Sequence, residues 1–291
     1  MRRIEYLLTQ VRASTENDGP NAQAIGDAEF MQHFNDAQDR LQSVLVGEYS
    51  KHFTKEGFIA LVAGQDEYDL PTDMLLNTLV SSVERTTNSN PGTDDYFPLD
   101  RIDLVERHVG TGYLIRNKKI IVSPVPTGNY TNGLRINYIY KIPTLDIRRG
   151  EVSAINDGTS LTITGHTATE ALLADYVSAV DFDGIQQIVA IKNKGFTNGT
   201  GVMLTDTSLT GLSLGDFVIL GKNSSSHSML EDICERYLVE YVSLRIFHRD
   251  SSSDKIFQSD VMQAIETDIM NLYATMSMDI DLPPVTNLEY L

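Results

Sequence analysis

The stretch from Gly26 to Val46 constrains the fold most, because its apolar residues recur at steps of three and four. Such spacing puts them on one side of a helix, with most of the intervening polar residues on the other side. The apolar stripe consists of Phe30, Phe34, Ala37, Leu41, Val44 and Leu45. Asp27 precedes the first turn, where its carboxylate can accept hydrogen bonds from free backbone N–H groups. A stripe this wide needs partner helices, and the sequence offers them only at its two ends.

The same helical spacing predicts a first helix over residues 2–13 and two further helices after residue 226. The first of these two is expected to start near Ser228, which together with Glu231 has the pattern of a capping box. The last helix is predicted over residues 254–276, and the pair Pro283-Pro284 prevents its continuation. We therefore expect the two ends of the chain to form one helical bundle.

Between these helices the apolar period changes to two, which is typical of half-buried strands. An alternating run at 134–140 and a hairpin around 116–119 predict a small antiparallel sheet. From Gly150 to Lys222, short β-rich runs alternate with Asn, Asp and Gly turns, which predicts a compact barrel or sandwich. These runs are 151–155, 161–164, 176–180, 185–191, 202–205 and 217–220. The predicted fold class is α+β, with a bundle, a small antiparallel sheet and an inserted all-β module.

The chain is accordingly expected to divide into four segments. They are residues 1–149 (first part of the bundle and the small sheet), 150–222 (inserted barrel or sandwich), 223–278 (helices completing the bundle) and 279–291 (extended tail). The tail carries Leu288, Tyr290 and Leu291, which an extended segment cannot bury by itself.

Charge limits the possible partners of the chain. Its 40 acidic and 23 basic residues give a formal net charge of -17, which disfavours a surface that grips nucleic-acid phosphates. Two interpretations stay open: the charge keeps the protein soluble, or it makes a surface that repels DNA. No apolar run approaches the length needed to span a bilayer, so we expect no membrane partner.

No catalytic, cofactor-binding or metal-ligating residue is predicted. The six histidines lack ligand spacing, and HExxH, paired CxxC and Gly-x-Ser-x-Gly motifs are absent. Cys234 falls on an apolar helical stripe and is expected to be a buried small hydrophobe. An enzyme stays open as an alternative because of carboxylate pairs such as Asp66-Glu67, Asp94-Asp95 and Asp181-Asp183. The Gly-rich stretch Asn193–Gly201, expected as a hairpin loop, leaves glycan binding open.

Four stretches, taken with the order of elements, resemble a known family. They are Asp27–Phe30, Asn35–Leu41, Gly64–Asp73 and Tyr140–Arg149. These residues are similar to the head-to-tail connector or adaptor proteins of tailed bacteriophages, with the tail tubular protein A type as the nearest.

The resemblance implies a structural virion protein that is not an enzyme and needs no cofactor. It implies a ring, commonly a dodecamer, docked under the portal protein at the neck between capsid and tail and assembled in the host cytoplasm. Further implied partners are tail nozzle or tube proteins, with fibres as a further candidate, and double-stranded DNA would pass through without specific binding. Leu288, Tyr290 and Leu291 would contact the portal or a neighbouring copy. The alternative is a tail or receptor-binding protein whose β module binds a glycan.

Overall fold

The computed structural model describes residues 3–15, 25–76, 79–88, 91–92, 95–104, 110–166, 175–197, 199–250 and 255–280, with backbone only at 247–250, 255–259 and 277–280. Contacts group the chain into two compact units. Unit 1 combines residues 1–45 with 143–291, and unit 2 is residues 46–142. The four segment limits drawn from the sequence stay a prediction.

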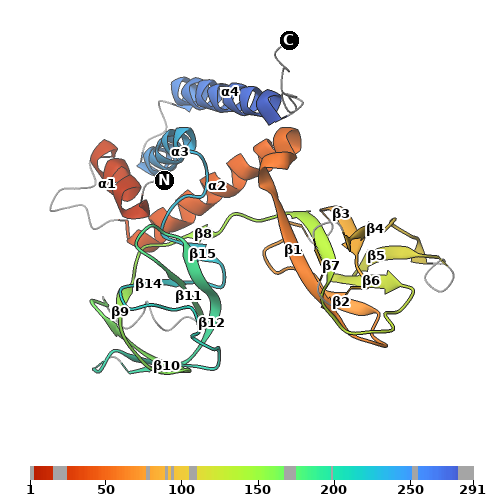
Figure 1. The fold of residues 1–291 in the computed structure, drawn as a ribbon. Helices are drawn as coiled ribbons and strands as arrows, with labels where there is room; N and C mark the ends of the chain where they lie inside the picture. The colour runs from red at the N-terminus through yellow and green to blue at the C-terminus, as the bar shows by residue number, and fades with distance from the viewer. Residues whose placement is uncertain are drawn as a thin grey trace, which may run out of the picture. The chain divides into compact units, whose positions relative to one another are not determined.

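The fold class is α+β, as predicted, with helices from both ends of the chain (Figure 1). The described α-helices are α1 (Ile4–Ser14), α2 (Asp27–Tyr49), α3 (Asp232–Asp250) and α4 (Lys255–Ile280). A short 3-10 helix at Ser50–Phe53 follows α2 directly. The expected capping box at Ser228 is wrong, because α3 begins four residues later at Asp232. The Ser228 hydroxyl instead accepts a hydrogen bond from the Leu230 amide (3.3 Å) within the preceding turn.

The helical part of unit 1 is held together by the stripes that the sequence predicts. Ile4, Leu7 and Val11 of α1 are fully buried, as are Phe34, Ala37 and Leu45 of α2. Val44, predicted to belong to the α2 stripe, is 38% exposed, since it lies at the border of the buried face. Hydrogen bonds also link three of these helices. The Glu266 carboxylate on α4 accepts from Tyr237 Oη on α3 and from Arg40 Nη2 on α2, both at 3.1 Å.

Six strands between residues 150 and 220 form a closed barrel, which decides between the two predicted possibilities (Figure 1). Its strands are β9 (Gly150–Asp157), β10 (Ser160–Thr164), β11 (Tyr176–Val180), β12 (Gln186–Thr197), β13 (Val202–Thr205) and β14 (Phe217–Leu220). They close in the order β10-β13-β12-β11-β14-β9 around an apolar interior that includes Val152, Leu161, Val177 and Met203. β13 alternates between this interior and the outside, whereas β11 and β14 have consecutive buried residues.

Two short strands connect the barrel to the helices. β8 (Thr144–Leu145) and β15 (Ser224–Ser225) pair in parallel, so the segments entering and leaving the barrel run side by side. The Asn35 side chain on α2 holds this connection from both sides, because its amide donates to the Leu145 carbonyl (3.0 Å) and its oxygen accepts from the Leu145 N–H (2.7 Å).

Unit 2 contains two antiparallel sheets, where the sequence predicted one small sheet. The first has the order β1-β7-β3-β4 and the second β2-β6-β5. The strands are β1 (Thr54–Leu61), β2 (Glu67–Asp69), β3 (Val80–Arg85), β4 (Phe97–Pro98), β5 (Gly112–Arg116), β6 (Lys119–Ser123) and β7 (Tyr130–Ile139). The predicted hairpin is β5–β6, and both sheets share one core that includes Tyr68, Ile120, Leu134 and Ile136.

Asp73 fixes the segment after β2 against the first sheet of unit 2. Its carboxylate accepts from Tyr138 Oη and from Lys55 Nζ, each at 2.7 Å. Burial on its own raises the pKa of Asp73, but the hydrogen bonds from Lys55 and Tyr138 outweigh it and hold the pKa below its usual value. The Gly64–Asp73 stretch singled out in the sequence therefore ends in an ionic contact at the surface of unit 2, with the Asp73 carboxylate partly buried.

Candidate functional site

The contact residues predicted from the sequence, Leu288, Tyr290 and Leu291, lie outside the described residues. The described surface offers other candidates. Three are built from side chains or backbone groups that the fold leaves accessible: a groove between α1 and the barrel, a smaller groove between α1 and α3, and the outer edge of β1 in unit 2.

A groove of about 780 Å³ separates α1 from the loop that joins β11 to β12, and we call it the α1–barrel groove. Its lining residues are Arg3, Glu5, Tyr6, Thr9, Phe182, Asp183 and His227. Tyr6 is 49% exposed and Phe182 is 61% exposed, so two aromatic rings border it. Exposed aromatic side chains beside charged ones are common at protein contact surfaces.

Arg148 lies beside the α1–barrel groove and contacts two residues that line it, Glu5 and Phe182. Its guanidinium lies 4.0 Å from the Phe217 ring centroid and 5.5 Å from that of Phe182, both within cation-π range. Its Nη2 donates to the Phe182 carbonyl (2.7 Å), and its backbone N–H donates to Glu5 Oε1 (3.1 Å). One residue therefore joins α1, the β11–β12 loop and β14. Burial lowers the pKa of Arg148, whereas the charge of Glu5 acts in the opposite direction.

His227 forms the other wall of this groove. Its Nδ1 lies 3.0 Å from Ser226 Oγ, and burial, with the positive charge of Arg148 as a further cause, lowers the pKa of the imidazole. Gly184, at φ +83°, leaves room for the ring, because a Cβ there would come within 2.0 Å of Nδ1. The His227 imidazole in the wall and the Arg148 guanidinium beside it make the groove suited to packing and hydrogen bonding.

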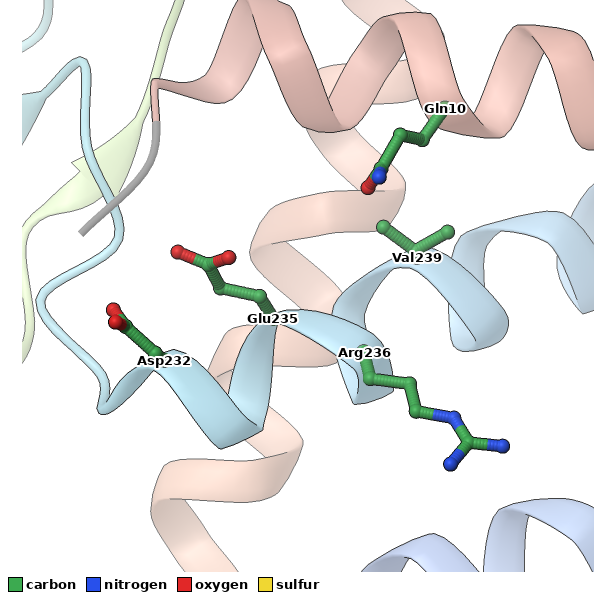
Figure 2. A pocket seen from close by; sticks show the side chains of 5 residues that line it. All are labelled: Gln10, Asp232, Glu235, Arg236 and Val239. Carbon is green, nitrogen blue, oxygen red and sulfur yellow. The ribbon is translucent and has the colours of Figure 1, made fainter.

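A second groove of about 380 Å³ lies between α1 and α3. Figure 2 shows Gln10 projecting from α1 toward α3, where the carboxylates of Asp232 and Glu235 lie to one side and the guanidinium of Arg236 to the other. Glu235 is only 6% exposed. With about half the volume, this groove offers less room for a partner than the α1–barrel groove.

In unit 2 the accessible feature is the first sheet. β1 and β4 are its outer strands, and on its surface Phe58 and Tyr96 lie with ring centroids 6.2 Å apart. Arg135 on β7 lies 4.4 Å from the Tyr96 ring centroid and forms an ion pair with Glu84. Phe58 and Phe97 remain 48% and 66% exposed.

We searched the described residues for metal-ligand clusters and for an activated nucleophile. In these ranges no group of three or more His, Cys, Asp or Glu is arranged to hold a metal ion. Cys234 is buried as predicted, and burial raises the pKa of its thiol to about 12, so it is a poor nucleophile. In the stretch Asn193–Gly201, residues 193–197 belong to the end of β12 and residues 199–201 form a turn before β13, while residue 198 lies outside the described residues. None of the described helices has both the length and the apolar content that a bilayer-spanning helix requires.

Comparison with known families identifies the kind of protein. Residues 6–157 match the family model of the SU10 adaptor protein. The chain belongs to the SU10 adaptor protein family. No curated protein matches the chain.

The matched residues of this SU10 adaptor family member begin in α1, cover α2 and unit 2, and end at the last residue of β9. Membership confirms the resemblance at the level of a phage adaptor, a structural protein that works in contact with other head and tail proteins. It also implies a role other than catalysis. The narrower resemblance to tail tubular protein A stays a prediction.

Sequence reasoning did not find the α1–barrel groove. Arg148 does lie in the stretch Tyr140–Arg149 that carried the family resemblance, which was a usable signal. Its partners Glu5, Phe182 and Phe217 come from three other parts of the chain, and no local pattern links them.

Proposed function

We propose that this SU10 adaptor family member forms a homo-oligomeric ring, with twelve copies as the expected number, that joins the portal protein to the tail at the virion neck. Its partners would be the portal on one side and tail nozzle or tube proteins on the other, with fibres as a further candidate. Double-stranded DNA would pass through the ring during ejection without specific binding.

The family match over residues 6–157 carries this proposal. The net charge of -17 supports the DNA part, because a lumen with many phosphate-binding cations would hold the genome back. Exposed apolar side chains on both units, Phe182 in unit 1 and Phe97 in unit 2, are of the kind that subunit contacts cover.

We assign the contact with the portal or a neighbouring copy to Leu288, Tyr290 and Leu291. They follow Pro283-Pro284, which prevents α4 from continuing, so an extended segment would present them to a partner. Their burial in a neighbour would contribute several kcal/mol, at roughly 1.5–3 kcal/mol for each large apolar side chain.

The test measures the mass of the full chain, alone and mixed with purified portal rings. We expect complexes with the portal for the natural chain and none for the variant with Leu288, Tyr290 and Leu291 all changed to Ser. The control changes Thr286 and Asn287 to Ser in the same segment and should bind as the natural chain does. Unchanged portal binding by the triple variant, with its helix content intact, would contradict this assignment.

A further inference from the structure

β1 is an outer strand of the first sheet in unit 2, paired with β7 on one side only. The register fixes which of its backbone groups point outward. Tyr140 N–H donates to the Phe53 carbonyl (3.0 Å), whereas Ile139, the partner of Thr54, exchanges its hydrogen bonds with Leu79 and Leu75 on the other side. Since the two kinds of pair alternate along an antiparallel ladder, Thr54, Glu56 and Phe58 direct their N–H and C=O groups away from β7.

This outward edge is accessible. Thr54, Glu56 and Phe58 are all exposed, with Phe58 at 48%. The Thr54 N–H already donates to the Lys51 carbonyl, so the open part of the edge begins at Glu56. Among the described residues, no backbone hydrogen bond reaches the outward groups of Glu56 and Phe58. An open strand of eight residues is a template for another strand, and natural proteins usually shorten, twist or cover such an edge.

We propose that the β1 edge is a docking site for residues 285–291 of a neighbouring copy, which add a strand to the sheet. This inference rests on the proposed ring, because it names the surface that receives the contact segment. The segment Val285–Leu291 is rich in strand-forming residues, and Thr286, Leu288 and Tyr290 alternate with Asn287 and Glu289. At about 3.3 Å per residue, its seven residues match the length of β1.

A strand added in this way explains two features of the sequence together. Main-chain hydrogen bonds would supply affinity, and one alternating set of side chains, which includes Leu288 and Tyr290, would reach the sheet face that carries Phe58. Pro283-Pro284 would keep the segment from pairing further upstream, since proline has no N–H to donate.

The contact is between unlike surfaces. Each copy contributes one β1 edge and one segment 285–291, so the contact repeats from copy to copy and closes into a ring where the rotation allows. Pairing of two β1 edges with each other would instead stop at a dimer.

The first test uses matched substitutions at Glu56 in the full chain. Glu56→Pro removes the outward N–H and keeps the β1–β7 ladder, while Glu56→Ala shortens the side chain and keeps the N–H. We expect Glu56→Pro to weaken self-association at least about tenfold and Glu56→Ala to leave it within about threefold. Equal effects of the two variants would overturn the proposal.

The second test is complementation. One chain has residues 285–291 replaced by a Gly-Ser segment of equal length, and the other carries Glu56→Pro. Each alone should stay monomeric, whereas their mixture should form a 1:1 dimer through the remaining edge and the remaining segment. A mixture that stays monomeric would overturn the proposal.

Hydrogen exchange of the Glu56 and Phe58 amides separates this inference from the proposed function. Protection should increase with concentration in the full chain and be absent from the Gly-Ser variant. If these amides are protected but the portal is not bound, the proposed function fails and the strand contact stands. If the portal is bound while these amides exchange freely at every concentration, the strand contact fails and the adaptor role stands.

Discussion

Arg148 joins three parts of unit 1 beside the α1–barrel groove, because its guanidinium contacts Phe182 and Phe217 while its backbone N–H donates to Glu5. Arg148→Ala removes the cation-π contacts and the hydrogen bond to the Phe182 carbonyl. We expect the free energy of unfolding of unit 1 to fall by about 1–3 kcal/mol. Arg148→Lys should recover little of this, because an ammonium group lacks the planar stacking surface. Urea titration checks the change, with Arg116→Ala on the exposed β5–β6 hairpin as the control; equal losses would contradict the assignment.

Asp73 makes unit 2 sensitive to acid. Its folded-state pKa lies below the ordinary value, so its ionic contacts stabilise the fold above the ordinary carboxyl range and are lost as pH falls through the lowered pKa. Asp73→Asn should therefore lower the free energy of unfolding by about 1–3 kcal/mol at pH 7. The difference from the natural chain should shrink toward zero as the medium becomes more acidic than the lowered pKa.

Chemical denaturation across this pH range measures that difference. Asp69→Asn is the matched control, because the Asp69 side chain is 89% exposed and lies 4.0 Å from Lys119. A gap between Asp73→Asn and the natural chain that persists unchanged in acid would show that the stabilisation has another origin.

At the scale of elements, local patterns predicted most strands and helices. The runs 176–180, 202–205 and 217–220 coincide with β11, β13 and β14, because each is a short apolar run bounded by turn residues within a few positions. Closure of the barrel depends on pairs such as Leu161 with Met203, which lie far apart in the chain, so local spacing could not decide between barrel and sandwich. The start of α3 was misplaced for a different, local reason: Ser228 suits a cap, but its hydroxyl accepts from the Leu230 N–H in the turn before the helix.

The barrel also provides a prediction about domain organisation. We expect residues 150–222 to be removable as a module, since the barrel has a closed core and its two connections lie side by side, with Thr144 N–H donating to the Asn223 carbonyl (2.9 Å). A chain joining Arg149 to Asn223 through a short Gly-Ser linker should keep its helical circular dichroism and unfold cooperatively. It should be less stable than the natural chain, because the contacts of Arg148 with Phe182 and Phe217 are lost. A non-cooperative transition in the shortened chain would contradict a modular insertion.

At the scale of the whole molecule, the excess of carboxylates sets how the protein meets DNA. Non-specific binding to duplex DNA draws its affinity from phosphate contacts with Lys and Arg, typically with a Kd of about 10⁻⁴ to 10⁻⁶ M at physiological salt. With 40 acidic against 23 basic residues, the chain should bind more weakly than this range. In physiological salt, the fluorescence anisotropy of a labelled duplex should not reach saturation at about 100 µM protein.

The salt dependence distinguishes repulsion from weak attraction. If like charges dominate, added salt should leave the signal flat or raise it slightly, because screening reduces repulsion. A basic patch formed by the fold would instead give binding that weakens steeply as salt increases. Such salt-sensitive binding would mean that the fold brings Lys and Arg side chains together on one surface that binds DNA. It would exclude a channel wall that repels DNA for this adaptor.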